Sequence, residues 1–225
     1  MKTIVITGAS RGIGLATATR FLEEGWQVVG TYNKTRIPIE NANCIGVQLD
    51  QGDTPSIKRA VEEIKQKAYQ IDVLINNAGI TLDWVEPQID LEKIRKTFEV
   101  NLFGVIDLTE QLLPKMLASS HIINIDSSYG AFSLPIDDES STGYRLSKAA
   151  LNMYTRTLAF RLKEKGIIVS SLDPGWVKTD MGNLGLSENE GPNREPEEVA
   201  SDIYQLVTTV QESGQFWRLG KKTDW

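Results

Sequence analysis

Short apolar runs alternate with helical patterns along the whole chain, and this alternation limits the possible folds more than any other feature. Each run has the length of a buried strand and is followed by residues that favour turns. Strands that alternate with helices predict a parallel sheet covered by helices on both faces. The seven runs are Ile4 to Thr7, Val28 to Tyr32, Ile45 to Leu49, Val73 to Asn76, Ile122 to Asp126, Ile167 to Leu172 and Phe216 to Leu219.

The segments between these runs carry apolar residues at the spacing of amphipathic helices, and two stripes are expected to face the core. Longer helices are expected from Ile94 to Leu117 and from Gly143 to Glu164, and their faces could form a homodimer or homotetramer contact. We predict an α/β fold, with one doubly wound Rossmann-type domain over residues 1–225 and a seven-stranded parallel sheet. The two stripes are Ile57, Ala60, Val61, Ile64 and Ala68, and Val199, Ile203, Leu206, Val207 and Val210.

Composition and charge argue against several other classes of protein. The 225 residues are 40% hydrophobic and 24% charged, and the net charge of −6 offers no basic surface for nucleic acid or an anionic membrane. Cys44 and His121 are the only cysteine and histidine, so we expect neither an internal disulfide nor a metal site. The first residues lack a signal peptide and no run approaches the ~18 apolar residues of a membrane span, so we expect a cytoplasmic location.

A glycine-rich turn follows the first run and opens the first helical pattern. A backbone that must turn sharply and approach a pyrophosphate tolerates little beyond glycine, and a helix N-terminus adds free N–H groups. Glycines also serve tight turns that bind nothing, but the position between a strand and a helix favours a dinucleotide site. The turn consists of Thr7, Gly8, Ala9, Ser10, Arg11, Gly12, Ile13 and Gly14.

The end of the second run indicates which dinucleotide binds. An NAD site places an acidic side chain there, and residues 30–36 contain none. Arg11 in the turn and Lys34 and Arg36 after the strand can instead offset the charge of a 2′-phosphate, although such cations are also ordinary surface residues. We therefore expect NADP(H) as the preferred cofactor, with NAD(H) as the other possibility.

Tyr144 and Lys148 lie four residues apart in a helical pattern, so their side chains share one face. An ammonium about 5 Å from the phenol would lower the pKa of Tyr144 by about 2, toward the working range of an acid or base. Ser127 lies at the carboxyl end of the fifth run, where open α/β sheets bind ligands, and can hold a carbonyl oxygen while Tyr144 donates the proton. The alternative is that Ser127 and Ser128 cap a loop.

In the order and spacing of these residues, the chain resembles the short-chain dehydrogenase/reductase family from end to end. The resemblance implies hydride transfer between a nicotinamide and a carbonyl or alcohol carbon of a small molecule. Asp173 to Met181 and the tail from Gly214 to Trp225 resemble the carbonyl-reductase-like branch that includes the sniffer and C-factor proteins. The matching residues are Thr7 to Gly14, Asp50, Asn76 to Gly79, Asn101, Ser127, Tyr144 with Lys148, and Pro174-Gly175 with Thr179.

The same resemblance assigns roles to residues. Tyr144 is the expected general acid or base, Ser127 orients the substrate, and Lys148 holds the nicotinamide ribose and lowers the pKa of the tyrosine. Asn101 is expected to hold a relay water, and asparagine inside a helix calls for such a reason because it is disfavoured there. The expected cofactor contacts are Thr7, Gly8, Ser10, Arg11, Gly12, Ile13, Gly14, Asn33, Lys34, Asp50, Asn77, Ala78, Gly79, Tyr144, Lys148, Pro174, Gly175, Val177 and Thr179.

We expect a carbonyl reductase in which NADPH delivers hydride to a ketone or aldehyde. Two alternatives stay open: an NADP(H)-binding sensor or signalling protein with incidental catalysis, and an alcohol dehydrogenase that works mainly in the oxidative direction. The substrate mouth is expected to involve the long segment between Ser127 and Tyr144 and the surface loop from Gly182 to Pro196. Asp126 stands where many relatives carry a small residue or serine.

Overall fold

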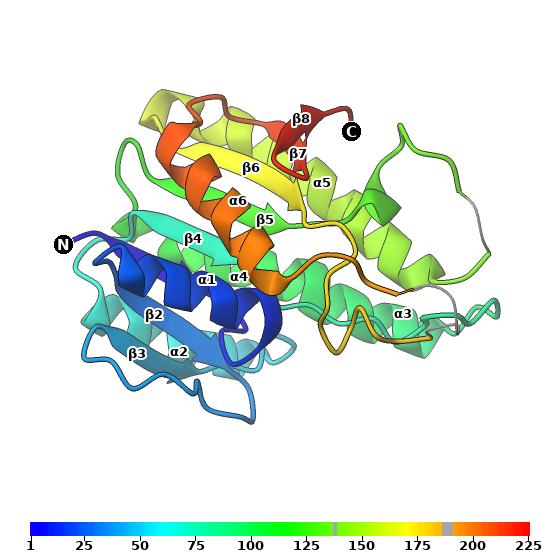
Figure 1. Cartoon of the computed structure of the whole chain (residues 1–225), viewed down its shortest axis with the longest axis horizontal. Helices are drawn as coiled ribbons and strands as arrows, with labels where there is room; N and C mark the ends of the chain where they lie inside the picture. Colours follow the sequence, from blue (N-terminus) through cyan, green and yellow to red (C-terminus); the bar gives the residue numbers. More distant parts are fainter. Residues whose placement is uncertain (137–138, 186–190) are drawn as a thin grey trace.

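Eight strands form one sheet in the computed structural model, which describes residues 1–136, 139–185 and 191–225. Across the sheet they follow the order β3-β2-β1-β4-β5-β6-β7-β8 (Figure 1). The fold class is therefore the predicted one, a single α/β Rossmann-like domain. The strands are β1 Thr3–Ile6, β2 Gln27–Tyr32, β3 Cys44–Gln48, β4 Val73–Asn76, β5 His121–Ile125, β6 Ile168–Asp173, β7 Gln215–Arg218 and β8 Lys221–Thr223.

The strand order reverses at β1, and this reversal positions the site. β1 pairs in parallel with β2 on one side and with β4 on the other. The chain therefore moves outward from β1 to β3 and then returns to the other side of β1. At such a switch point the loops that follow the two central strands diverge and leave a crevice at their carboxyl ends. The loops after β4, β5 and β6 meet the turn after β1 at this crevice.

All seven predicted strands are present and parallel, but the sheet has an eighth strand that the sequence did not indicate. β8 is antiparallel to β7, and the two are joined by Leu219 and Gly220, whose φ angles are 50° and 73°. Two successive positive φ angles are typical of the tight turn of a hairpin. β8 consists of Lys221, Lys222 and Thr223 and has no apolar period, so pattern analysis could not detect it.

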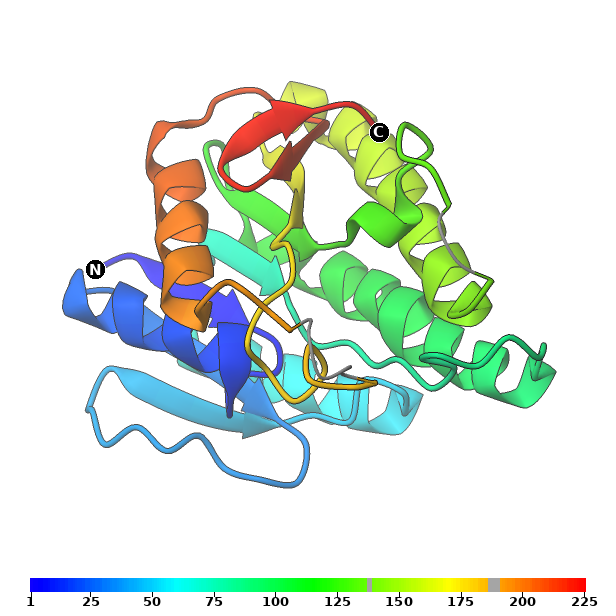
Figure 2. The same ribbon diagram turned by 45° about the vertical axis from the view of Figure 1, so that its right-hand side comes forward.

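Helices cover both faces of the sheet (Figures 1 and 2). The α1 and α6 layer packs on Ile4 and Ile6, while the layer of α2, α4 and α5 packs on Val5, so β1 alternates its side chains between two cores. The two predicted apolar stripes face these cores. Within the described ranges, no helix has the length and apolar character needed to cross a membrane. The covering helices are α1 Gly12–Glu23, α2 Thr54–Lys67, α4 Gly104–Leu112, α5 Thr142–Leu162 and α6 Pro196–Thr209.

The helix predicted from Ile94 to Leu117 is divided into several parts. The helix α3 Leu91–Phe98 passes into a π-helical turn over Glu99–Phe103, which leads into α4, and a 3-10 turn follows at Leu113–Lys115. A π turn holds one more residue than a regular helical turn and is frequent at functional sites. The apolar spacing on either side stays helical, so periodicity alone could not reveal the interruption.

The structure describes only parts of the two segments expected at the substrate mouth, the one between Ser127 and Tyr144 and the loop from Gly182 to Pro196. Before Asp137 and Asp138, which lie outside the described residues, Ser133 N donates a hydrogen bond to Trp225 O at 2.9 Å. The Trp225 ring stacks on Phe216 with 5.5 Å between the ring centroids. The middle of the Gly182 to Pro196 loop, residues 186–190, also lies outside the described residues. The C-terminal hairpin therefore supports the beginning of the segment that follows Ser127.

Candidate active site

The glycine-rich turn connects β1 to the N-terminus of α1 with a backbone that requires glycine. Gly8 and Gly12 have φ angles of 68° and 53°, which side chains rarely adopt. A Cβ on Gly14 would lie 2.2 Å from Gly8 O, so only glycine permits this close approach of helix and turn. The N–H groups at the start of α1 point into the crevice end of the sheet, which suits a phosphate.

Thr7 and Asn77 join the ends of β1 and β4 beneath this turn. Thr7 Oγ1 accepts hydrogen bonds from the backbone N–H groups of Asn77 and Ala78, both at 2.9 Å. In return, Asn77 Nδ2 donates to Thr7 O at 2.8 Å. These three predicted cofactor residues therefore hold one another in place, and Gly8 N donates to Thr31 Oγ1 at 3.2 Å on the other side.

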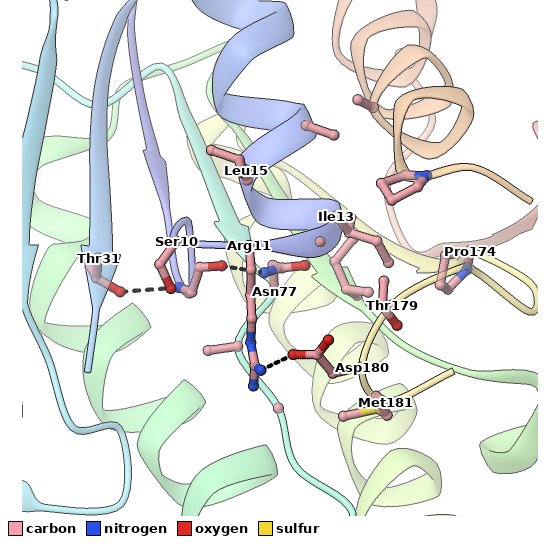
Figure 3. A pocket seen from close by; sticks show the side chains of 18 of the residues that line it. Ser10, Arg11, Ile13, Leu15, Thr31, Asn77, Pro174, Thr179, Asp180 and Met181 are labelled. Atoms are coloured by element: carbon pink, nitrogen blue, oxygen red, sulfur yellow. Dashed lines mark hydrogen bonds and ion pairs between the residues drawn. The ribbon is translucent and has the colours of Figure 1, made fainter. Parts of the chain in front are cut away.

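A cleft with a volume of about 850 Å³ runs from this turn to the end of β5 (Figure 3). Its size and its glycine floor fit a dinucleotide. Thr7, Gly14, Lys34, Gly175 and Val177 were also predicted as cofactor contacts but lie outside the lining as described. The predicted residues that line the cleft are Gly8, Ser10, Arg11, Gly12, Ile13, Asn33, Asp50, Asn77, Ala78, Gly79, Tyr144, Lys148, Pro174 and Thr179.

Arg11 pairs with Asp180 across the mouth of the cleft (Figure 3). Both side chains are exposed, at 76% and 70%, so water screens the pair. Asp180 comes from the loop after β6 and was not among the predicted site residues, although it directly follows Thr179. The other cations expected near a 2′-phosphate, Lys34 and Arg36, are exposed beyond the end of β2.

Tyr144 and Lys148 project from the first turns of α5 toward the inner end of the cleft. Their side chains are 9% and 6% exposed, and Lys148 Nζ lies 5.7 Å from the centre of the Tyr144 ring. Lys148 Nζ also donates a hydrogen bond of 2.7 Å to Ile125 O at the end of β5. The helical spacing in the sequence therefore correctly indicated a phenol and an ammonium on one face.

The pKa of Tyr144 is raised, and the shift expected from the sequence was wrong in sign. Burial of the phenol is the largest cause, and the negative field of Asp126 adds to it, while interaction with the Ser127 side chain lowers the pKa. Burial also lowers the pKa of Lys148. The sequence displays one neighbouring cation, whereas the desolvation of the ring and the carboxylates from other strands arise only in the folded chain.

Ser127 is the second residue after β5, at the edge of the sheet where the Tyr144 phenol lies. Its backbone N–H donates to Asp126 Oδ1 at 2.8 Å, and its Oγ accepts from Tyr129 N at 3.2 Å. The hydroxyl thus starts a short 3-10 turn over Ser128–Gly130, as the capping alternative expected. Because the same side chain also interacts with Tyr144, capping and placement beside the phenol are combined in one residue.

Asn101 lies in the π-helical turn and is 1% exposed. Its amide accepts from Ile80 N at 2.9 Å and donates to Ile80 O at 2.8 Å, and Nδ2 lies 3.1 Å from Ser147 Oγ. A Cβ on Gly79 would lie 3.4 Å from Asn101 Oδ1 and 3.9 Å from Lys148 Nζ. The structure therefore places Tyr144 and Lys148 in the lining at one end of the cleft, while Ser127, beside Tyr144, and Asn101, beside Gly79, lie outside that lining.

Asp126 is a buried acid in the cleft lining that the sequence reasoning left without a role. Burial raises the pKa of Asp126 to about 7, while the charge of Lys148 acts against this shift. An acidic residue that ends an apolar strand directly before the expected substrate serine was the available signal. Its own surroundings come from β6 and α5 and could not be read from the neighbouring residues.

Two aromatic rings flank Tyr144 and were also missed. Trp84 stacks on Tyr129 with centroids 5.6 Å apart, and both rings stand edge-on to Tyr144, at 6.4 Å and 6.3 Å. Trp84 Nε1 donates to Leu184 O at 2.8 Å, which ties the loop after β4 to the loop after β6. The ring of Tyr129 also lies beneath the Arg145 guanidinium, 4.0 Å away. Because the three rings come from distant segments, no local pattern could have indicated them.

The single histidine takes no part in this arrangement. His121 is 2% exposed at the start of β5, and its Nε2 lies 2.9 Å from Ser170 Oγ. Burial lowers the pKa of His121 to about 3, which keeps the ring neutral. Among the residues that the structure describes, no group of three or more acidic, cysteine or histidine side chains is arranged to hold a metal ion.

Sequence comparison relates the chain to known oxidoreductases. Residues 2–189 match the model of a family described as short chain dehydrogenase. A 3-oxoacyl-(acyl-carrier-protein) reductase of Buchnera aphidicola is 33% identical over 187 residues, which are 80% of this chain and 75% of that protein. A serine 3-dehydrogenase of Agrobacterium fabrum is 30% identical over 221 residues, which are 92% of this chain and 88% of that protein.

Solved structures agree with the observed fold. A carbonyl reductase from chicken fatty liver, solved with NADPH bound, is 28% identical, with a TM-score of 0.87 over 100% of this chain and 94% of that one. The Sniffer protein of Caenorhabditis elegans is 24% identical and covers 100% of both chains with a TM-score of 0.84, a likeness of fold. The resemblance seen in the sequence is confirmed, and the chain belongs to the short-chain dehydrogenase/reductase family of oxidoreductases.

Proposed function

We propose that this protein uses NADPH to reduce a ketone or aldehyde of a small molecule to an alcohol. The observation that carries the proposal is that Tyr144 and Lys148 line the inner end of a dinucleotide-sized cleft, with the Ser127 side chain in contact with Tyr144. A hydroxyl and a phenol beside one another can hold and protonate the same oxygen atom. Reduction of a carbonyl, and in reverse the oxidation of an alcohol, uses both groups.

NADPH is the cofactor that this cleft favours. The end of β2 presents Tyr32 and Asn33 to the cleft, and no carboxylate stands there to accept from a ribose 2′-hydroxyl. Arg11 at the cleft mouth supplies a cation that can turn from Asp180 to a 2′-phosphate. The chicken carbonyl reductase to which the chain is similar was solved with NADPH, which supports the same preference.

The residues of this chain would divide the reaction among them. NADPH, when bound, would supply a hydride for the carbonyl carbon. Ser127 donates a hydrogen bond to the carbonyl oxygen, and the Tyr144 hydroxyl transfers its proton to that oxygen as it becomes an alcohol. Lys148 keeps one N–H on Ile125 O at 2.7 Å, so two N–H groups remain to hold the cofactor ribose and to return a proton to Tyr144.

Asn101 acts through its position in the π-helical turn. Its Nδ2 is taken by Ile80 O and Ser147 and its Oδ1 already accepts from Ile80 N, so only the second lone pair of Oδ1 remains for a relay water. A π turn can leave a backbone carbonyl without its regular helical hydrogen bond, and such a group could bind that water; Glu99 O and Val100 O already accept from Gly104 N and Gln51 Nε2. Asn101 would thus fix the loop after β4 against α5, and its segment would supply the water site beside Lys148.

The aromatic rings of Trp84 and Tyr129 suggest the kind of substrate. They form an apolar wall on one side of Tyr144, where the group attached to the carbonyl carbon would lie. Aromatic walls favour flat or apolar groups over charged ones. We therefore favour carbonyl compounds with an aromatic or apolar substituent.

A panel of aldehydes and ketones, scored by NADPH consumption, tests the proposal together with Tyr144→Phe. The variant should bind NADPH as the wild type does, measured by cofactor fluorescence, and lose about 10²- to 10⁴-fold in turnover because the proton donor is gone. Full activity of the variant would contradict the assignment of Tyr144. If the wild type bound NADPH but reduced no member of the panel, the sensor alternative would be favoured, and alcohols with NADP⁺ would test the oxidative direction.

A homodimer or homotetramer is part of the same proposal. Leu146, Met153 and Phe160 are spaced seven residues apart on α5 and are 50%, 54% and 83% exposed, so they form one apolar stripe on the helix surface. Stripes of this kind mark contacts between protein chains. Sedimentation of the wild type and of Phe160→Glu should reveal an oligomer that the substitution weakens.

A further inference from the structure

Asp126 is a carboxyl group that is buried inside the reaction centre and receives its hydrogen bonds from neutral groups. It is 2% exposed at the end of β5 and lines the cleft with Tyr144 and Lys148. Oδ1 accepts from Ser127 N at 2.8 Å, and Oδ2 lies 3.1 Å from Ser171 Oγ on β6. A buried carboxylate without a cation in direct contact is costly, so such a group tends to keep its proton.

The Ser171 hydroxyl lies between two oxygen atoms, and both could accept a hydrogen bond from it. Its Oγ lies 3.1 Å from Asp126 Oδ2 and 2.8 Å from Asn152 Oδ1. The Asn152 amide is oriented by Nδ2, which donates to Gly130 O at 3.2 Å, so Oδ1 must face the serine. A hydroxyl has one proton and can donate to only one of these two oxygens.

A protonated Asp126 satisfies every contact in this row. The carboxylic acid donates from Oδ2 to Ser171 Oγ, and Ser171 then donates to Asn152 Oδ1. With an ionised Asp126, either the carboxylate or the Asn152 oxygen faces Ser171 Oγ without a proton between them. The geometry of this row of hydrogen bonds therefore favours the neutral acid by itself.

The charged groups around Asp126 act in both directions. From α5, the Lys148 ammonium favours ionisation of Asp126, and the Tyr144 phenol would disfavour it only once the phenol itself ionised. From β6, Asp173 disfavours ionisation, and Arg218 on β7 partly offsets Asp173 through an ion pair of 3.0 Å. Burial outweighs Lys148 and brings the pKa of Asp126 to about 7, so its charge changes near neutral pH.

We propose that Asp126 is a positioning residue of the reaction centre, protonated in the active form, whose ionisation slows proton transfer by Tyr144. The inference rests on the proposed function and adds a pH control to it. An ionised Asp126 raises the pKa of Tyr144. Tyr144 then becomes a poorer acid, so reduction slows as pH rises, and oxidation gains less phenolate from a higher pH than it would beside a neutral Asp126.

Infrared spectroscopy tests the protonation state without any substrate. At a pH of about 6, where exposed carboxyl groups are already ionised, the wild type should show the carbonyl stretch of a neutral carboxylic acid. The band should vanish as pH rises through neutrality and be missing in Asp126→Asn. The band should persist in Asp173→Asn. This substitution is the matched control because Asp173 is another buried carboxyl group and pairs with Arg218. A wild-type spectrum identical to that of Asp126→Asn would overturn the proposal.

Asn152→Ala provides a second variant that leaves Asp126 in place. Without the amide oxygen, Ser171 can donate to Asp126, which stabilises the ionised form. The midpoint at which the infrared band disappears should therefore move to lower pH. An unchanged midpoint would contradict the hydrogen-bond row on which the inference depends, even if Asp126→Asn failed to fold.

The kinetic measurement is the pH profile of kcat with a saturating carbonyl substrate. Wild-type kcat should fall about threefold to tenfold between pH ~6 and pH ~8, as expected when the pKa of the acid rises by about one. Asp126→Asn should lack this step, whereas a merely structural role would lower kcat equally at every pH. Parallel profiles would overturn the positioning role. A wild type that reduced no carbonyl would overturn the proposed function, while the infrared titration would still decide the protonation of Asp126.

Discussion

The two ends of the cleft are built in different ways. At the outer end, the site consists of backbone: Gly8, Gly12 and Gly14 shape a turn whose N–H groups face the crevice, and all of them lie within one short segment. At the inner end, the site consists of buried side chains from β5, β6 and α5, and their acidity depends on one another. Binding at the outer end is a local property of the sequence, whereas reactivity at the inner end is a property of the assembled fold.

After Tyr144→Phe, Ser127→Ala should have the largest effect, and it tests whether Ser127 acts on the substrate or only caps the loop. Loss of one hydrogen-bond donor to the reacting oxygen typically costs about 10² to 10³ in kcat. Ser128→Ala removes the neighbouring hydroxyl and should leave kcat within about twofold of the wild type. Steady-state kinetics on one reducible carbonyl compares the two. Equal losses would mean that Ser127 acts by shaping the loop.

The pH dependence of stability should also distinguish the inner end. The pKa of Asp126 is raised to about 7 in the folded protein, above about 4 for an unfolded aspartate, so the folded state binds the proton more tightly. The stabilisation that this proton gives to the folded state is fully present below pH ~4. As pH rises through ~7, the free energy of unfolding falls by about 2 to 4 kcal/mol. Urea unfolding at pH ~5 and pH ~8 should therefore show that Asp126→Asn gains stability relative to the wild type at the higher pH. A constant difference between the two proteins would refute this.

Gly14→Ala addresses the outer end. The added Cβ would lie 2.2 Å from Gly8 O and 2.7 Å from Asn77 Nδ2, so the turn must shift. Overpacking of this kind costs about 1 to 3 kcal/mol, and we expect NADPH affinity to fall about tenfold or more. Gly25→Ala is the matched control, because its Cβ meets nothing within 4 Å even though its φ is 76°. That control should lose some stability and keep its affinity for NADPH.

Arg11→Met should have the smallest effect and bear on cofactor choice alone. Removal of a cation that binds a 2′-phosphate should weaken NADPH binding about tenfold and leave NADH binding nearly unchanged. Asp180→Asn, which frees Arg11 from its partner, should act in the opposite direction by a few-fold. Fluorescence titrations with both cofactors measure these changes. An equal loss of affinity for NADH and NADPH would indicate that Arg11 contacts a part of the dinucleotide that both cofactors share.

Much of the outer end and of the fold could be predicted because the signals are local. The alternation of strands and helices follows from the periods of apolar residues, and the seven parallel strands appear where those periods place them. Tyr144 and Lys148 share a face because helix geometry fixes side chains four residues apart. Gly12 and Gly14 mark the start of α1 for reasons of backbone conformation.

The features that were missed depend on contacts between distant segments. β8 exists because Gly220 allows a hairpin, and its polar residues carry no strand period. The acidity of Tyr144 was mispredicted because burial and Asp126 outweigh the single cation that the sequence displays. Trp84, from the loop after β4, stacks on Tyr129 from the loop after β5, and only the folded chain brings these loops together.

The π-helical turn at Glu99–Phe103 has a consequence for the tolerance of this chain to deletions. Each helical residue rotates the following side chains by about 100°, so the extra residue lets α3 and α4 face their neighbours in two separate registers. Loss of one of the other residues of this turn would regularise the helix and change the register in which Asn101 faces Ile80. A single-codon deletion here should be far more damaging than a substitution at most of the same positions.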